Sequence, residues 1–217
     1  MDKNLERASR LDTATLSDAL DRHGLAGQCR SIMPVSNDFR LTGRAWTLLY
    51  GPAGSPPGTV GDYLDDLGPD TVVVLDNRGR MDATVWGDIL TELASRKQLA
   101  GTVIDGINRD VALCLELKYP IYTRGHWMRT GKDRVQVEAT QVPVSIGEAR
   151  VCPGDLLRGD ADGIVVLPKE REDEVLATAE SIHATEDAIR AAVRAGLSLR
   201  EARARFGYHG LQTREIR

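Results

Sequence analysis

Apolar runs alternate with amphipathic stretches through the middle of the chain. Continuous apolar runs of the kind found in buried strands cover residues 71–76 and 102–105, and a further strand is expected over 119–125. Between them, residues 83–98 and 109–118 place apolar side chains at helical spacing. The order strand, helix, strand, helix, strand with short connections predicts a parallel α/β unit with right-handed crossovers.

A separate helix is predicted near the start of the sequence, over residues 11–25. Asp12 or Thr13 can cap its first turn, because a short polar side chain there accepts hydrogen bonds from N–H groups that lack a partner within the helix. Gly24 suits the left-handed residue that commonly follows a helix.

The regions that flank the α/β unit have other patterns. Residues 43–50 alternate loosely and predict a strand, whereas residues 51–62 are rich in glycine and proline and predict a functional loop. Short strands separated by turn residues predict antiparallel β structure over 134–168. A helix-rich region follows from 169 to 205 and is broken at Gly196. The fold class is therefore expected to be α/β.

Composition excludes several classes of function. The formal net charge is −4 and aromatic residues make up 5% of the chain, so no nucleic-acid partner is expected. Three cysteines without a CxxC pair give no zinc motif and predict a reduced, cytoplasmic protein. No apolar run approaches the roughly 20 residues that a membrane-spanning helix needs, so no membrane partner is expected either.

Candidate chemistry lies where two of the predicted helices begin. Gly87 and Asp88 follow the strand at 71–76, and Arg109 and Asp110 follow the strand at 102–105. Ligands of parallel α/β units collect at the carboxyl ends of strands, so these two pairs are expected to be neighbours. The alternative is structural: Asp88 would be a helix cap, and Arg109 with Asp110 an exposed ion pair.

The residue types at these two places fit a small carboxylate beside a metal. Helix amino termini offer backbone N–H groups, and Gly87 allows an anion to approach them closely. Arg109 adds a planar fork for a carboxylate, while Asp88 and Asp110 are hard oxygen ligands suited to Mg²⁺ or Mn²⁺. A 2-oxo acid chelated there could be cleaved or decarboxylated through an enolate.

The stretch of sequence that contains both pairs, called the signature below, resembles the corresponding stretch of a known family. The stretch WGDILTELASRKQLAGTVIDGINRD, in which 20 residues (89–108) separate Asp88 from Arg109 and Asp110, is similar to that of RraA-like proteins and class II 4-hydroxy-4-methyl-2-oxoglutarate / 4-carboxy-4-hydroxy-2-oxoadipate aldolases. TATLSDAL, GRAWTL, VVVLDN and VCPGDLLRGDADGIVVLP extend the resemblance over most of the chain.

The resemblance implies a swivelling α/β/β/α sandwich with peripheral N- and C-terminal helices. A single domain would span residues 1–217, with a C-terminal helical extension over about 169–217. The resemblance also implies a homotrimer or homohexamer with sites between subunits. The implied activity is that of a divalent-metal-dependent lyase, which cleaves a 4-hydroxy-2-oxo acid to pyruvate and a carbonyl compound or decarboxylates oxaloacetate.

The resemblance also implies roles for individual residues. Asp110 would anchor Mg²⁺ or Mn²⁺ largely through water, and Arg109 would bind the carboxylate or keto oxygen of the oxo acid. Asp88 would orient a metal-bound water that acts as acid or base. The pyruvyl carboxylate would rest on the backbone amides of four residues, Gly87, Asp88, Ile89 and Leu90.

One departure from the family pattern bears on the substrate. Aldolases that cleave dicarboxylates carry an acidic residue three positions after the final aspartate of the signature, whereas this chain has Leu113 there and Glu116 a turn later. The departure weakens the prediction that this protein cleaves those dicarboxylates. It does not affect the predicted metal and pyruvyl parts of the site. Some RraA-like proteins are ribonuclease regulators, so a non-enzymatic binding protein is the rival prediction.

Three further residues are weaker candidates. Glu186 could reach the metal of a neighbouring subunit through water, although a solvated helix face also explains it. Asn77, at the end of a predicted strand, is a candidate substrate contact. Arg44 could act as a second carboxylate clamp.

Overall fold

Buried strands alternate with amphipathic helices in the middle of the chain, as the sequence predicts. A computed structural model gives the fold and describes residues 2–211. Five elements make up the central unit: β3 (Thr71–Asp76), α3 (Asp88–Arg96), β4 (Gly101–Asn108), α4 (Val111–Glu116) and β5 (Ile121–His126). The three strands are parallel and adjacent, in the order β3, β4, β5. The parallel α/β unit is therefore confirmed.

The sheet continues on both sides of this unit. The full order is β1-β5-β4-β3-β2-β9-β10, with β6 paired to β2. Only β2 joins the parallel set, and the remaining strands pair antiparallel. The bounds of these strands are β1 Met33–Pro34, β2 Leu41–Pro52, β6 Val135–Thr140, β9 Leu156–Asp160 and β10 Gly163–Leu167. The antiparallel structure predicted for 134–168 is confirmed.

The two ends of the sheet approach each other. Gln28, shortly before β1, forms an isolated antiparallel bridge with Val165 of β10, and the N–H of Cys29 donates to the carbonyl of Ile164. The sheet is therefore a nearly closed barrel. A small hairpin, β7 (Val144–Ile146) and β8 (Ala149–Val151), packs against β2, β3 and β4.

Two adjacent buried aspartates fasten this hairpin to the sheet. Asp76 and Asp105 are paired in the register of β3 and β4. The N–H of Ser145 donates to Asp76 over 3.1 Å, and the N–H of Gly147 donates to Asp105 over 2.7 Å. Asp105 is also paired with Arg124 of β5. Both aspartates therefore satisfy backbone N–H groups of the hairpin and do not line the strand-end cleft described below.

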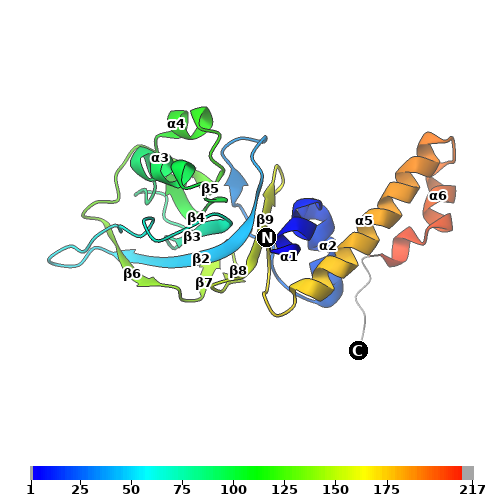
Figure 1. The fold of residues 1–217 in the computed structure, drawn as a ribbon, viewed down its shortest axis with the longest axis horizontal. Coiled ribbons are helices and arrows are strands. Elements are labelled where there is room, and N and C mark those ends of the chain that lie inside the picture. Colours follow the sequence, from blue (N-terminus) through cyan, green and yellow to red (C-terminus); the bar gives the residue numbers. More distant parts are fainter. Residues whose placement is uncertain (1, 212–217) are drawn as a thin grey trace.

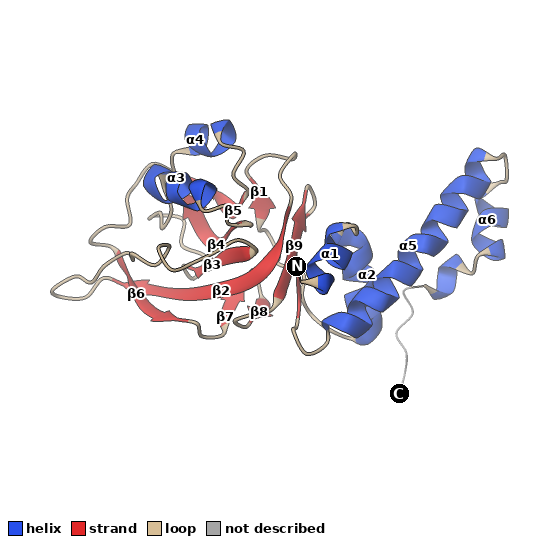
Figure 2. Ribbon diagram, in the orientation of Figure 1, coloured by secondary structure: helices blue, strands red, loops and turns tan. Residues whose placement is uncertain are grey.

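Helices cover the sheet in two groups (Figures 1 and 2). Figure 1 shows α3 and α4 together over one part of the sheet and the terminal helices gathered beside β9. The terminal helices are α1 Lys3–Ser9, α2 Thr13–His23, α5 Glu172–Arg194 and α6 Leu199–Arg205, followed by a 3-10 turn at Tyr208–Gly210. The buried residues form one cluster inside the barrel and under α3, and a second between β9, β10 and the terminal helices. The α/β fold with peripheral helices at both ends is confirmed.

Local chemistry accounts for the ends of α2 and α5. The Asp12 side chain accepts from the N–H of Thr15, and Gly24 adopts φ 66°, so both predicted ends of α2 are correct. The predicted break at Gly196, where φ is 99°, separates α5 from α6. Among residues 2–211, no helix combines the length and the apolar character needed to cross a bilayer.

Candidate active site

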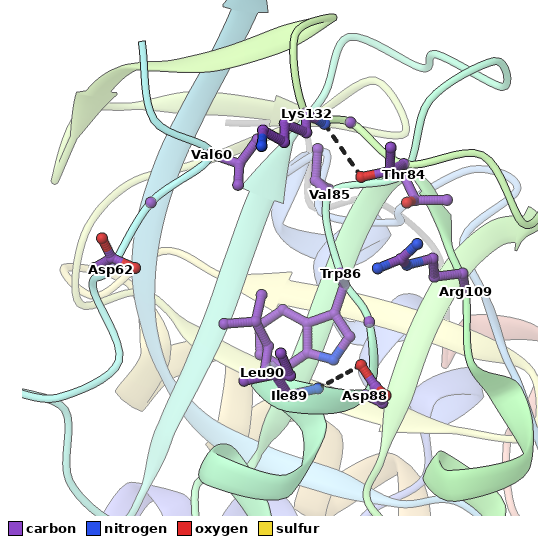
Figure 3. A pocket seen from close by; sticks show the side chains of 14 residues that line it. Val60, Asp62, Thr84, Val85, Trp86, Asp88, Ile89, Leu90, Arg109 and Lys132 are labelled. Atoms are coloured by element: carbon purple, nitrogen blue, oxygen red, sulfur yellow. Dashed lines mark hydrogen bonds between the residues drawn. The ribbon is translucent and has the colours of Figure 1, made fainter.

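A cleft of about 230 Å³ opens at the carboxyl ends of β3 and β4. Four segments line it: residues 60–62 of the glycine- and proline-rich loop, residues 84–90, Arg109, and residues 130–132. Figure 3 shows Arg109 and Asp88 on one side of the cleft and Asp62 across from them. The two ends of the predicted signature therefore meet in one cleft, as the sequence predicts.

Asp110 connects the two halves of the signature. Its Oδ2 accepts a hydrogen bond of 3.0 Å from the backbone N–H of Asp88 and lies 3.3 Å from Nε of Arg109. The side chains of Arg109 and Asp110 are 39% and 37% exposed, so both remain open to a ligand. One carboxylate thereby sets the relative placement of the guanidinium and the first turn of α3.

Two backbone features make this arrangement possible. Asp110 adopts the left-handed conformation with φ 57° and ψ 43°, which is uncommon outside glycine and most accessible to Asn and Asp. Gly87 has no Cβ, and a Cβ built there would lie 2.8 Å from Oδ2 of Asp110 and 3.1 Å from Nε of Arg109. Glycine at position 87 thus leaves room for both functional groups.

Hydrogen bonds of the buried Trp86 and of Thr91 fix the loop that carries Gly87. Trp86 is 2% exposed, its indole N–H donates to the Thr91 hydroxyl over 2.9 Å, and its carbonyl accepts from the N–H of Arg109 over 3.0 Å. The Thr91 hydroxyl in turn donates to the carbonyl of Gly87 over 2.9 Å. The position of the amino terminus of α3 is therefore fixed relative to the end of β4.

The amino terminus of α3 is already engaged by carboxylates of the protein itself. Oδ1 of Asp88 accepts from the N–H of Ile89 over 2.8 Å, in addition to the contact between Asp110 and the N–H of Asp88. These are N–H groups on which a substrate carboxylate is predicted to rest. Within the protein, this helix end therefore donates hydrogen bonds to two carboxylates, as expected for the positive end of a helix dipole.

The donor set fits a divalent metal bound mostly through water. No three side chains among His, Cys, Asp and Glu cluster closely enough to hold a metal within the described residues. Within those residues, Oδ1 of Asp110 and Oδ2 of Asp88 accept no hydrogen bond, so one hard oxygen of each carboxylate remains for a cation. Mg²⁺ commonly binds through one or two carboxylates and keeps several waters, so these residues suit Mg²⁺ or Mn²⁺.

The structure adds cleft residues that the sequence did not single out. Lys132 and Thr130, on the segment after β5, line one end of the cleft, and the N–H of Lys132 donates to the Thr130 hydroxyl over 3.3 Å. Asp62 faces Arg109 from the loop (Figure 3). The glycine and proline content signalled the loop, but no pattern in the sequence signals Lys132.

Two of the weaker candidates lie elsewhere. Asn77 is 1% exposed and its amide donates to the carbonyl of Ala83 over 3.1 Å, so it supports the loop that leads to Gly87 and does not line the cleft. The expectation that Arg44 clamps a substrate carboxylate is wrong. Its guanidinium is paired with Asp2 and with Glu172 at the start of α5, where it fastens the terminal helices to β2.

Glu186 and Cys114 are also outside the cleft. Glu186 lies on α5 and pairs with Arg190 over 3.3 Å, and Figure 1 places α5 on the other side of the molecule from α3 and α4. Its predicted contact with a metal would have to come from a neighbouring copy of the chain, and it stays a prediction. Cys114 is fully buried, and burial raises the pKa of its thiol to about 11, which suits packing and not nucleophilic attack.

The fold and the cleft define a class of protein: a nearly closed α/β sheet with a small cleft, lined by the amino terminus of a helix, an arginine and an aspartate, at the carboxyl ends of its parallel strands. The sequence profile of the RraA-like family, described as Aldolase/RraA, matches residues 13–166. The chain therefore belongs to the RraA-like family.

Individual relatives cover different parts of their own length. A protein of Halalkalibacterium halodurans that carries the provisional name 4-hydroxy-4-methyl-2-oxoglutarate aldolase is 33% identical over 178 residues, or 82% of each chain. Protein DlpA of Legionella pneumophila is 36% identical over 94% of this chain, which spans only 34% of DlpA.

Solved structures show the same fold. An uncharacterized protein of Pseudomonas syringae pv. tomato matches with a TM-score of 0.86 and 38% identity, covering 92% of this chain and 96% of the other. RraAS2 of Streptomyces coelicolor, described as an unusual member of the RNase ES inhibitor RraA family, matches with a TM-score of 0.80 and 28% identity, covering 88% and 97%. The family thus includes proteins named for an enzymatic activity and proteins named for inhibition.

Proposed function

We propose that this protein is a divalent-metal-dependent carbon–carbon lyase for small 2-oxo acids. It cleaves a 4-hydroxy-2-oxo acid to pyruvate and a carbonyl compound, decarboxylates oxaloacetate, or does both. One observation carries the proposal: the amino terminus of α3, Asp88 and Arg109 line one cleft, and the Asp110 carboxylate contacts both the N–H of Asp88 and the guanidinium of Arg109. The aldolase names of several relatives support the same class of reaction.

The carboxylate of the oxo acid binds the backbone N–H groups of residues 87–90, where helix geometry favours an anion. Two of these groups donate to Asp110 and Asp88 in the free protein. The substrate carboxylate takes the place of both side chains, so that substrate binding frees the two aspartates for their own roles.

Arg109 binds the keto oxygen of the substrate. Negative charge develops on that oxygen as the carbon–carbon bond breaks, and a charge-assisted hydrogen bond from the planar guanidinium stabilises it. Asp110 is the residue that would anchor Mg²⁺ or Mn²⁺, largely through water, and the metal when bound would polarise the oxo acid as a Lewis acid. Placing Asp110 beside Arg109 lets the two charges act on the same end of the substrate.

Asp88 acts as the base in aldol cleavage. Through a water molecule that it orients, it accepts the proton of the C4 hydroxyl while the C3–C4 bond breaks, and the electron pair of that bond forms the enolate of pyruvate. The carbonyl compound leaves, and the proton that Asp88 accepted returns by the same water to C3 of the enolate, which gives pyruvate and restores the carboxylate. Oxaloacetate gives the same enolate by losing CO₂ from C4, a step with no hydroxyl proton to remove.

The carbonyl half of the substrate lies toward the loop side of the cleft. Val60 and Asp62 come from the loop there, and Lys132 comes from the segment after β5 (Figure 3). The apolar and charged groups of this side select the leaving carbonyl compound. Leu113, in place of an acidic residue, sets this chain apart from the aldolases that cleave dicarboxylates.

We also propose that the protein assembles as a homotrimer or homohexamer in which Glu186 of one copy approaches the metal site of another. Glu186 is 23% exposed and held by Arg190, on a helix that projects away from the sheet (Figure 1). Light scattering tests the assembly. A fully active monomer would exclude shared sites and the proposed role of Glu186.

A turnover assay decides between the lyase and a non-enzymatic binding protein. Purified protein with Mg²⁺ or Mn²⁺ is given oxaloacetate and a panel of 4-hydroxy-2-oxo acids, and pyruvate is measured against a blank with metal alone. Pyruvate above the blank supports the lyase. Folded protein that produces none with any substrate supports the inhibitor-like function for which the Streptomyces relative is named.

A further inference from the structure

Asn108 has an unusual environment for a polar residue. It is the last residue of β4, directly before Arg109 and Asp110, and it is 0% exposed. Its Nδ2 donates to the backbone carbonyl of Arg109 over 3.3 Å. Its Oδ1 is buried and has no hydrogen-bond partner within the described part of the chain.

A buried acceptor without a partner is unfavourable for stability. Leucine has nearly the same shape as asparagine and would fill the position without that cost. Strand β4 is otherwise a suitable place for leucine, because Ile104 and Ile107 on the same strand are fully buried. The amide at position 108 therefore needs an explanation other than stability.

The hydrogen bonds around Asn108 supply this explanation. Its own carbonyl accepts from the N–H of Trp127 over 3.0 Å, and the N–H of Arg109 donates to Trp86 over 3.0 Å, so the chain is fixed up to Arg109. The next peptide turns sharply, because Asp110 has φ 57°. The carbonyl of that peptide is the group that the amide of Asn108 holds.

We propose that Asn108 is a positioning residue for the site. Its amide fixes the peptide between Arg109 and Asp110, and thereby keeps Asp110 in the left-handed conformation that directs its carboxylate to the N–H of Asp88. The inference rests on the proposed function, since it assigns Asn108 to the metal- and oxo-acid-binding arrangement. Asn108 need not touch the substrate to do this.

The test compares Asn108→Leu with Thr102→Val in the full chain. Thr102 lies at the other end of β4, is 0% exposed, and shares a 2.9 Å hydrogen bond with the Tyr119 hydroxyl, so it is a buried polar residue remote from the cleft. Mn²⁺ affinity is measured by electron paramagnetic resonance, oxalate affinity by calorimetry in the presence of Mg²⁺, and Tm by calorimetry.

Asn108→Leu should keep or raise Tm while Mn²⁺ and oxalate bind about 10–100-fold more weakly, the range seen when support for a ligating group is removed. Thr102→Val should lower Tm, because it strands the Tyr119 hydroxyl, and should leave both affinities unchanged. Mn²⁺ and oxalate affinities of Asn108→Leu within twofold of the wild type would overturn the proposal.

Crystal structures of the wild type and Asn108→Leu separate this inference from the proposed function. Asp110 should leave its left-handed conformation, or lose its bond to the N–H of Asp88, only in the variant. If the wild type binds neither Mn²⁺ nor oxalate, the proposed function fails, and the backbone comparison still decides the role of Asn108. An unchanged Asp110 in Asn108→Leu would overturn that role.

Discussion

The backbone N–H of Asp88 donates to the Asp110 carboxylate over 3.0 Å, although 22 positions separate the two residues in the chain. The bond joins the first turn of α3 to the turn that follows β4. The positions of both aspartates are therefore interdependent, and a change at either end of the signature should affect the other. The prediction for Gly87, which comes first below, follows from this coupling.

Gly87→Ala should reduce kcat/KM about 100-fold, because a displacement of about 1 Å at a reacting group can have that effect. The new Cβ would lie 2.8 Å from Oδ2 of Asp110, while the backbone at φ −147° accepts alanine readily. Tm should change little. The matched control is Gly68→Ala, where no atom lies within 4 Å of the new Cβ. Equal kinetics in the two variants would contradict the close approach at Gly87.

Removal of metal by EDTA should abolish activity, and Mg²⁺ or Mn²⁺ should restore it. Asp110→Asn keeps a residue that tolerates the left-handed conformation but lacks the charge, so Mn²⁺ affinity measured by electron paramagnetic resonance should fall at least about tenfold. Asp110→Ala should lose metal affinity and turnover together. Full activity in metal-free protein would rule out the mechanism.

Arg109→Lys and Asp88→Asn should have different kinetic effects. Lysine keeps the charge of Arg109 without its planar fork, so KM should rise and kcat should fall together. Asp88→Asn is nearly isosteric but cannot accept the proton, so kcat for aldol cleavage should fall about 10²–10⁴-fold while KM changes little.

Oxaloacetate provides the control for the proton transfer. Its decarboxylation has no hydroxyl proton to remove, so Asp88→Asn should impair it less than it impairs aldol cleavage. Steady-state kinetics with both substrates make the comparison. Small and equal effects on the two reactions would contradict the proton transfer and would indicate that Asp88 only caps the helix.

Arg44→Met should lower the free energy of unfolding by about 3 kcal/mol without changing kcat, because it leaves the carboxylate of Glu172 without its charged partner. The Glu172 side chain is 9% exposed, and the hydrogen bonds that Arg44 donates to Glu172 and Asp2 raise the pKa of Arg44. Denaturant unfolding measures the loss. The exposed pair Arg10 and Glu6 is the control, and Arg10→Met should cost less than about 1 kcal/mol.

Acid should destabilise the protein partly through Asp160. Burial tends to raise the pKa of Asp160, but hydrogen bonds from the hydroxyl and N–H of Thr13 and from the N–H of Asp162 lower it overall. A lowered pKa in the folded state gives stability that is complete above the unfolded pKa of about 3.9 and is lost as the pH falls through the folded value.

Asp160→Asn should therefore be less stable than the wild type at pH 7 and should lose less stability between about pH 4 and pH 2. Urea unfolding across this pH range measures both effects. Parallel stability curves for the two proteins would contradict the assignment.

The apolar pattern was enough to predict the core elements, because continuous apolar runs and helical spacing report burial directly. It predicted β3, β4 and β5, and the conformational preference of glycine predicted the end of α2 at Gly24. It did not predict α1, whose sequence KNLERAS is mostly polar and buries only Leu5 and Ala8. A helix with so small an apolar face is stabilised by its tertiary contacts with α5.

The site was predictable where geometry follows from topology and not elsewhere. Strand ends of a parallel sheet must meet, so the pairing of Asp88 with Arg109 and Asp110 could be expected. The role of Arg44 depends on where α5 returns to the sheet, and the position of Lys132 depends on an irregular segment. Neither has a periodic signal in the sequence.

The cleft has two walls of different origin. One is made by strand ends and a helix, locked by the hydrogen bonds of Trp86 and Arg109, and the other by residues 60–62 on a long irregular loop. Insertions or deletions in that loop would reshape one wall and leave the other in place. Descendants of this sequence could therefore adopt new partners for the same chemistry through changes in loop length alone, and chimeras that exchange residues 53–63 between relatives would reproduce that evolutionary step in the laboratory.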